Sequence, residues 1–385
     1  MVKRYLIGLA VFLLGIMACT GGDNPGEKRA LRAEKSTGPI VIGAAAPWSE
    51  IKNGLWQGIE LALSEINNEG GVLGRRIHVV KRDDEASVTK GQIVAQQFAE
   101  NIDMVAMIGH YNSYISYATS IIYEYYDLLM LSPTSTTPRL TERGFKCVFR
   151  NIPSDSVFGR ELADFCDGQG YQNMVIYHSS DEYGQRLADA FEMEAEKKGI
   201  AIVDRIDYTS LSDIKNFQKD FAYWSDNFSF DAVFLGGITP QAGYIIKEAR
   251  SLGIKVPIIG GEGLDSPELF KSAGESAINV FVGSPFYPER KEKKVQHFVK
   301  AFSDKYNTIP DSKAAQGYDA MKLLAWAMEK AQSTVPSRIA DALRATKGWE
   351  GATGFHTYAE NGDIVEDEIF IKEARNGRFE YYKSQ

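Results

Sequence analysis

The sequence predicts an α/β protein made of two doubly wound lobes, each with a parallel sheet. Short apolar runs alternate with longer amphipathic segments over most of the 385 residues, and this alternation is typical of βαβ units. The alternation starts again after Pro153, which indicates a second lobe of similar size. Two further helical segments follow the second set of strands. The chain is therefore expected to cross between the lobes more than once, through a multi-crossing hinge.

The composition is that of a folded globular protein, with 44% hydrophobic and 24% charged residues. The formal net charge is -8, and no dense basic patch interrupts the acidic balance. Nucleic-acid binders need clustered Lys and Arg to neutralise phosphates. We therefore expect no nucleic-acid partner.

The N-terminus has the pattern of an export signal. Lys3 and Arg4 precede an apolar stretch over 5–17, which is too short to span a bilayer as a helix. The tetrapeptide IMAC that ends at Cys19 resembles a bacterial lipobox. It implies a signal peptide over 1–18 and lipidation of Cys19. A secreted protein in which Cys19 has no role stays an alternative.

The residues after Cys19 are rich in Gly, Lys, Glu and Ala, and they show no apolar face. We interpret 19–37 as a lipidated flexible tether. The protein is thus expected to be exported and anchored by lipid to a membrane, facing the periplasm or the cell exterior.

The remaining cysteines and the histidines give no metal pattern. Cys147 lies in a predicted strand and Cys166 in a predicted helix, so their spacing leaves a disulfide between them open. The 5 histidines are scattered. We expect neither a metal site nor a cofactor.

A first set of strands and helices accounts for the first lobe. Residues 39–46 form an apolar, β-branched run typical of a buried strand. An amphipathic helix over 55–67 follows, and then a Gly-rich turn, a second strand ending in acidic residues and a helix over 89–100.

The stretch over 108–137 has strand, helix, strand character and ends in hydroxyl side chains. Asn112 or Ser113 is expected near the N-cap of the helix, where backbone N–H groups suit an anion such as a carboxylate. The carboxyl ends of neighbouring parallel strands meet at one edge of a sheet, so Thr134, Ser135 and Thr136 should face Ser113. An ordinary N-cap beside a polar loop is the alternative.

The second lobe repeats the pattern, and two helices and a strand-rich tail with an Asn-Gly-Asp turn follow it. The expected strands lie over 173–180, 200–208, 230–238, 256–263 and 279–287, and the expected helices over 159–169, 183–199, 212–226, 243–253, 294–306 and 314–331.

Several motifs, in this order and spacing, identify a family. The chain resembles the type I periplasmic substrate-binding proteins, in the Leu/Ile/Val-binding branch of ABC transport receptors, from Gly38 to the C-terminus. The motifs are EINNEGGVLGRRIHVVKRDDE, IGHYNS, LSPTSTTPRLTERG, VFRNIPSDSVFG, DEYGQ, GGITP, IGGEGLDSPEL and GYDA.

The resemblance implies the type I periplasmic binding protein fold, with a ligand cleft between lobes that hinge. Lobe 1 would consist of residues 38–152 and 285–352, and lobe 2 of residues 153–284 and 353–385. We expect a monomer.

In this family, lobe 1 holds the ligand carboxylate and lobe 2 holds the ligand amine. The resemblance assigns Ser113 to the carboxylate and Glu262 to the ammonium, a division that suits a partly desolvated zwitterion. A solvated loop carboxylate is the alternative for Glu262. The further ligand-binding positions that match are Thr134, Thr136, Tyr111, Asn112 and Tyr183.

Three departures from the family pattern concern the ligand side chain. Ile238 stands where an aromatic residue often follows the Gly pair, Trp48 lies in a shortened first loop, and Lys313 falls near a position that is often apolar. Ile238 and Trp48 join the predicted site, and an apolar or aromatic amino acid is the expected ligand. Trp48 serves equally well as a core residue.

The expected function is a receptor that captures an amino acid and delivers it to an ABC permease. The alternative is a sensor of the same fold for an amide or aromatic acid, coupled to a signalling partner. No catalytic motif occurs in its expected setting, and the pair Ser113 and His110 lacks an obvious orienting third group. The protein is not expected to be an enzyme.

Overall fold

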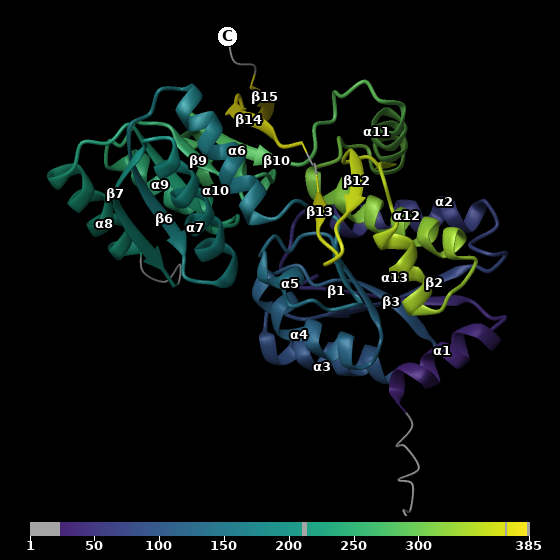
Figure 1. The fold of residues 1–385 in the computed structure, drawn as a ribbon. Coiled ribbons are helices and arrows are strands. Elements are labelled where there is room, and N and C mark those ends of the chain that lie inside the picture. Colours follow the sequence, from purple (N-terminus) through teal and green to yellow (C-terminus); the bar gives the residue numbers. More distant parts are fainter. Residues whose placement is uncertain (1–23, 210–213, 366–367, 383–385) are drawn as a thin grey trace, which may run out of the picture.

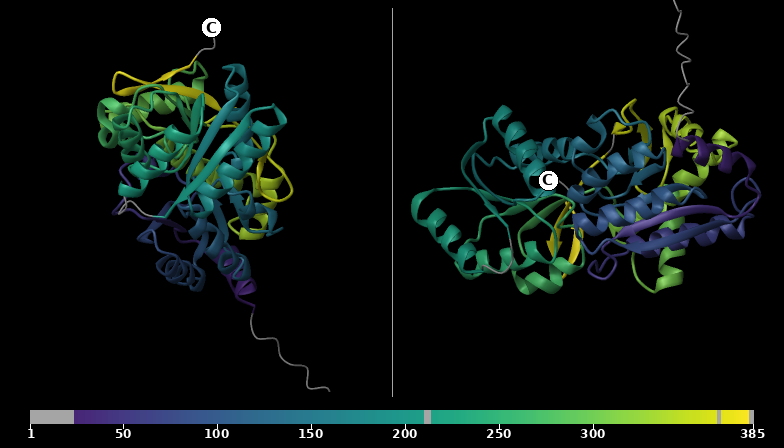
Figure 2. Two further views of the ribbon diagram at one scale, coloured as in Figure 1. Left: turned by 90° about the vertical axis from the view of Figure 1, so that its left-hand side faces the viewer. Right: turned by 90° about the horizontal axis from the view of Figure 1, so that it is seen from below.

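A computed structural model describes residues 24–209, 214–365 and 368–382. Two lobes lie side by side (Figure 1), and the view from below shows the same arrangement along the long axis of the molecule (Figure 2). Each lobe has its own sheet with helices on both faces, as the alternation in the sequence predicts.

Lobe 1 is built on a five-stranded parallel sheet with the order β2-β1-β3-β4-β5. The inner strands are mostly apolar because both of their faces are covered, and β3 is buried throughout, whereas the edge strand β2 is largely half-buried or exposed. The strands are β1 (Ile40–Ala46), β2 (Ile77–Asp83), β3 (Met104–Gly109), β4 (Leu129–Ser132) and β5 (Val148–Arg150). The helices are α2 (Leu55–Asn68), α3 (Val88–Glu100), α4 (Ser113–Tyr125), α5 (Arg139–Glu142), α11 (Lys293–Tyr306), α12 (Ser312–Ala331) and α13 (Pro336–Arg344).

Lobe 2 is built on a seven-stranded sheet with the order β15-β14-β10-β9-β8-β6-β7. The strands from β10 to β7 are parallel, whereas β14 and β15 add an antiparallel hairpin at one edge. The strands are β6 (Asn173–Ser179), β7 (Ala201–Tyr208), β8 (Ala232–Gly236), β9 (Ile258–Gly260), β10 (Val280–Ser284), β14 (Phe370–Arg375) and β15 (Arg378–Tyr381). The helices are α6 (Asp155–Gly168), α7 (Glu182–Lys197), α8 (Ile214–Asn227), α9 (Gln241–Ser251) and α10 (Glu268–Ala273), with a 3₁₀ turn over 274–276.

The last segment returns to lobe 2 later than the sequence suggested. A small antiparallel sheet of β11 (Trp349–Glu350), β12 (Phe355–Tyr358) and β13 (Ile364–Val365) packs on lobe 1. Tyr358 and Ile364 are part of the lobe 1 core. Packing therefore places the crossing after Val365 and not at residue 353.

Helices α2 and α12 pack closely against each other in lobe 1, and two glycines allow this close approach. A Cβ on Gly58 would lie 1.9 Å from the carbonyl oxygen of Ala314, and one on Gly317 would lie 2.4 Å from that of Leu55. This packing fixes the start of α12 against lobe 1.

Residues 25–35 form helix α1 (Pro25–Lys35) and pack on lobe 1, so the expected flexible tether is wrong for these residues. Asn24 caps the helix by accepting a hydrogen bond from Gly26 N at 3.0 Å. Arg29 is fully buried and donates to the carbonyl of Ala99, and Ala33 is 6% exposed. The buried face lacks large apolar side chains, which is why its pattern resembled a linker. Cys19 lies outside the described residues.

Cys147 and Cys166 are both buried free thiols, so they form no disulfide. Burial raises the pKa of the Cys147 thiol to about 12 and raises that of Cys166 as well. Among the described residues, no helix is long and apolar enough to cross a membrane.

The α2–α12 contact leads to a stability prediction. We expect Gly58→Ala to lower the free energy of unfolding by about 1–3 kcal/mol, because the added methyl group meets backbone that cannot move aside. Gly168→Ala is the matched control, since a Cβ there meets no atom within 4 Å. Denaturant unfolding followed by circular dichroism compares the variants. Equal effects of the two changes would contradict this role of Gly58.

Candidate functional site

A small cleft lies between the two lobes, where the strands of both sheets end. The cavity that remains in it is narrow, at about 20 Å³. We expect ligand entry to involve the lobes moving apart, as in other two-lobed proteins that close by a hinge. The lining residues come from both lobes and are Tyr111, Asn112, Ser113, Tyr114, Thr134, Asp181, Tyr183, Ile238, Glu262, Gly263 and Lys313.

On the lobe 1 side, the cleft meets the N-terminus of α4. The helix begins at Ser113 with Asn112 as its N-cap residue, so its first N–H groups and its positive dipole end lie at the cleft. Ser113 is 3% exposed and Thr134 is 5% exposed. Thr134 Oγ1 donates to the carbonyl of Tyr111 at 2.8 Å, which fixes the two loops to each other. This side is suited to an anion.

On the lobe 2 side, a carboxylate is already held in position. Tyr183, in the first turn of α7, donates its hydroxyl to Glu262 Oε2 at 2.9 Å. The same hydroxyl accepts a hydrogen bond from Gly263 N at 3.0 Å. Glu262 is 3% exposed. The sequence left a solvated loop carboxylate as an alternative for Glu262. The structure instead shows this carboxylate buried and hydrogen-bonded.

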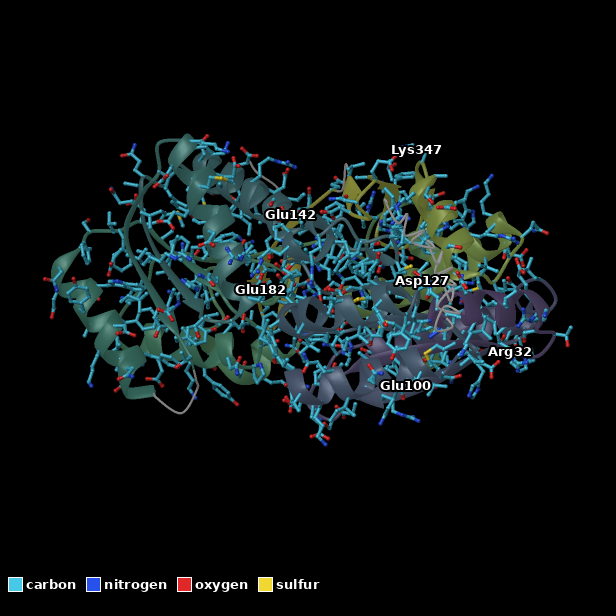
Figure 3. All side chains as sticks on the ribbon, turned by 60° about the horizontal axis from the view of Figure 1, so that its bottom comes forward. Arg32, Glu100, Asp127, Glu142, Glu182 and Lys347 are labelled. Carbon is cyan, nitrogen blue, oxygen red and sulfur yellow. The ribbon has the colours of Figure 1, made fainter. Side chains whose placement is uncertain are left out.

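Direct contacts between the lobes border the cleft. Thr137 and Arg139 of lobe 1 donate to the Glu182 carboxylate at 2.9 and 3.0 Å, and Glu182 lies at the boundary between the lobes (Figure 3). Inside the cleft, Lys313 Nζ of α12 lies 3.6 Å from Glu262 Oε1. A cation of lobe 1 therefore already faces the acidic residue of lobe 2.

Burial changes the proton affinity of several groups near the cleft. Burial raises the pKa of the Tyr183 hydroxyl, and the nearby carboxylate of Glu262 adds to this. The pKa of Tyr111 is raised for the same two reasons. Burial also raises the pKa of Asp155, with Glu262 contributing. The tyrosines therefore stay protonated and neutral, and Tyr183 donates to Glu262 while the Tyr111 hydroxyl accepts from Asn53 Nδ2 at 3.1 Å.

Behind the lobe 1 side, buried hydroxyls gather around one carbonyl. The carbonyl oxygen of His110 accepts from Ser116 at 3.2 Å and from Ser132 and Ser135 at 3.4 Å. The His110 ring lies between Asp84, at 2.6 Å from Nδ1, and Tyr123, at 2.9 Å from Nε2. The ring nitrogens are thus bonded away from Ser113, so the pair Ser113 and His110 does not form a nucleophile and base.

Most of the predicted ligand-binding residues come together in the cleft, namely Tyr111, Asn112, Ser113, Thr134, Tyr183, Ile238 and Glu262. Thr136 and Trp48 do not line it. Thr136 is fully buried. Trp48 donates to the carbonyl of Arg82 at 2.8 Å and packs edge-on against Trp56 at 5.6 Å. This packing favours the core interpretation of Trp48.

Sequence reasoning did not place Lys313, Tyr114, Asp181 and Gly263 in the site. Lys313 had a usable signal, because a cation in the first turn of a helix opposes the helix dipole. Asp181 caps α7 by accepting from Gly184 N at 3.0 Å, which the sequence could equally have explained as structure alone. In the described part of the chain, no cluster of His, Cys, Asp and Glu suits a metal ion.

Comparison with known proteins shows the family of this chain. A sequence profile described as periplasmic binding protein matches residues 41–378. The chain belongs to the periplasmic binding protein family. The Leu/Ile/Val-binding protein of Escherichia coli is 31% identical over 327 residues, with 84% of this chain and 87% of that protein covered. This periplasmic binding protein is therefore in the Leu/Ile/Val-binding branch, and it is an extracytoplasmic binding protein and not an enzyme.

Solved structures of periplasmic binding proteins show the same fold. An ABC transporter substrate-binding protein from Desulfitobacterium hafniense, solved in complex with Leu, is 42% identical with a TM-score of 0.80, covering 89% of this chain and 100% of that one. A leucine-binding protein from Thermotoga maritima is 26% identical with a TM-score of 0.82, covering 89% and 98%. These similarities confirm the two-lobed α/β fold with parallel sheets.

The lobe 2 side of the site generates a prediction about stability. Tyr183→Phe removes a donor from buried Glu262 and an acceptor from Gly263 N, so we expect the free energy of unfolding to fall by about 1–3 kcal/mol. Tyr244→Phe on α9 is the control, because Tyr244 is 42% exposed. Denaturant unfolding checks both variants. A Tyr183→Phe protein as stable as the control would show that this hydroxyl does not hold the carboxylate in place.

Proposed function

We propose that the protein captures an amino acid in the interlobe cleft and delivers it to an ABC permease. The observation that carries the proposal is that the cleft has a side suited to an anion in lobe 1 and a side suited to a cation in lobe 2. The N-terminus of α4 with Ser113 and Thr134 suits a carboxylate, and the buried Glu262 with Tyr183 suits an ammonium group. A zwitterion matches both ends at once.

In this proposal, the ligand backbone is bound by polar groups and its side chain by the remaining lining. Ser113 and Thr134 take the carboxylate, while Glu262 takes the ammonium. Tyr111, Asn112 and Ile238 line the space next to them and set the ligand preference. Thr136 and Trp48 support the site from outside the lining.

The ligand class is proposed from the lining and from the relatives. Ile238 and the tyrosine rings favour an apolar side chain. The relative from Escherichia coli is named a Leu/Ile/Val-binding protein, and the one from Desulfitobacterium hafniense was solved with Leu. We therefore propose branched-chain amino acids first and aromatic ones second.

The mechanism follows from the two-sided cleft. A ligand first binds lobe 1, and lobe 2 then closes over it, so that Glu262 meets the ammonium only in the closed form. Closure also forms the contacts of Glu182 with Thr137 and Arg139. The closed form is what a permease would recognise, since it exists mainly when ligand is bound.

Calorimetric titration with leucine tests the proposed function on protein that has been unfolded and refolded to remove carried-over ligand. We expect Ser113→Ala to weaken binding by about 1–3 kcal/mol, because a buried carboxylate loses a donor. Glu262→Gln should cost about 2–5 kcal/mol, because the buried ammonium loses its counter-charge. Ser251→Ala and Glu248→Gln, on the outer part of α9, are controls. Unchanged affinity in both site variants would refute the proposed ligand orientation.

We also propose that lipid on Cys19 attaches the mature protein to a membrane, on the basis of the IMAC sequence that ends at this residue. The intact mass of protein purified from membranes tests this. We expect a chain that starts at Cys19 and carries diacylglycerol and an acyl group, and we expect Cys19→Ser to lack this added mass. Thr20→Ala is the control that should keep it. An unmodified wild-type chain would contradict the anchor.

A further inference from the structure

The ion pair between Lys313 and Glu262 has a consequence for the ligand class. Lys313 is 3% exposed and Glu262 is 3% exposed, and Nζ lies 3.6 Å from Oε1. The two residues come from different lobes and both line the cleft. The position of the ligand ammonium in the proposed function is thus next to an ammonium that belongs to the protein.

The surroundings of Lys313 leave Glu262 as the carboxylate it pairs with. Lys313 lies in the first turn of α12, where the helix dipole disfavours a cation. Asp311, the N-cap residue of α12, is an acid close to Lys313 in the same helix turn. Its oxygens already accept backbone hydrogen bonds from Gly54 N at 2.9 Å and from Ala314 N at 2.8 Å. A buried ammonium needs a counter-charge, and Glu262 supplies it.

The other groups around Glu262 do not replace this cation. Tyr183 donates a neutral hydrogen bond to the second carboxylate oxygen. Asp155 is fully buried, and its carboxyl group supplies no positive charge in either protonation state. Lys313 is therefore the cation that balances Glu262 in the cleft, within the residues that the structure describes.

We propose that Lys313 removes the requirement for a ligand amine, so that the cleft also binds carboxylic acids without one, 2-oxo acids foremost. This inference rests on the proposed function, because it keeps the ligand carboxylate at Ser113 and the α4 N-terminus. In a cleft without Lys313, an amine-free ligand would leave Glu262 buried and unpaired. A site built around a polar partner rejects analogues lacking that partner by roughly 10⁴-fold.

The chemistry of a 2-oxo acid fits the same place. Its carboxylate needs the donors of lobe 1, and its oxo oxygen is an acceptor where an amino acid carries its ammonium. Lys313 has three N–H donors, so it can donate to the oxo oxygen and still face Glu262. An amino acid instead brings a second cation beside Lys313, and the like charges disfavour each other. Lys313 thus raises the affinity for 2-oxo acids and lowers the affinity for amino acids, so the difference between the two affinities becomes smaller.

The experiment compares two ligands that share a side chain and differ at the second carbon. Leucine and 4-methyl-2-oxopentanoate are each titrated calorimetrically into the two-lobed protein, after it has been unfolded and refolded to remove carried-over ligand. In the wild type we expect dissociation constants within about tenfold of each other. We define the ratio as the dissociation constant of the oxo acid divided by that of leucine. Lys313→Met should raise this ratio at least about a hundredfold above its wild-type value. Lys330→Met, at the exposed end of the same helix, is the control and should leave the ratio unchanged.

A double variant separates the charge effect from any loss of folding. Lys313→Met with Glu262→Gln removes both charges of the pair, so that no unpaired carboxylate is left at position 262, and we expect it to bind the oxo acid better than Lys313→Met does. The inference is overturned if the wild type binds leucine but excludes the oxo acid, or if Lys313→Met leaves the ratio as it was. If the wild type binds neither ligand, the proposed function fails first and the inference fails with it.

Discussion

The site depends on one geometric constraint, which is that both parallel sheets end at the same cleft. Parallel strands place their carboxyl ends, and the loops that follow, at one edge of a sheet. Here the edges of two sheets face each other. Ser113 follows β3, Thr134 follows β4, Tyr183 follows β6 and Glu262 follows β9. Residues that are far apart along the chain therefore meet without any long loop to carry them.

Each half of the site is held in place before a ligand arrives. In lobe 1, serine hydroxyls donate hydrogen bonds to the carbonyl oxygen of His110, and the Thr134 hydroxyl donates to that of Tyr111. In lobe 2, Tyr183 joins Glu262 to Gly263 N. All of these bonds lie within a single lobe, so hinge motion leaves them intact. The binding groups thus lose little conformational freedom on closure, which favours affinity.

Much of the fold and part of the site could be predicted from the sequence, because apolar residues recur with the period of a helix or a strand. Features that do not depend on this period could not be predicted. Buried strands and amphipathic helices are recognisable by the period of their apolar residues, and the end of a predicted strand locates Ser113. Glu262 was assigned through the family resemblance. Helix α1 could not be found in this way, because Arg29 and Ala33 form its buried face. Trp48 does not line the cleft, and the sequence could not distinguish the two positions, since an aromatic residue in a loop suits a pocket and a core equally. The pairing of Lys313 with Glu262 could be found only from the structure, because the two residues are far apart in the sequence and belong to different lobes.

The order of the segments has a consequence for how the chain folds. The apolar face of α2 packs on α12, which follows all of the parallel strands of lobe 2 in the sequence. Lobe 1 therefore cannot complete its core while only its first 150 or so residues are available, as happens during synthesis. Until the later helices arrive, residues such as Leu55 and Ile59 stay exposed to solvent and to other chains. An exported protein with this arrangement benefits from staying unfolded until the whole chain has crossed the membrane.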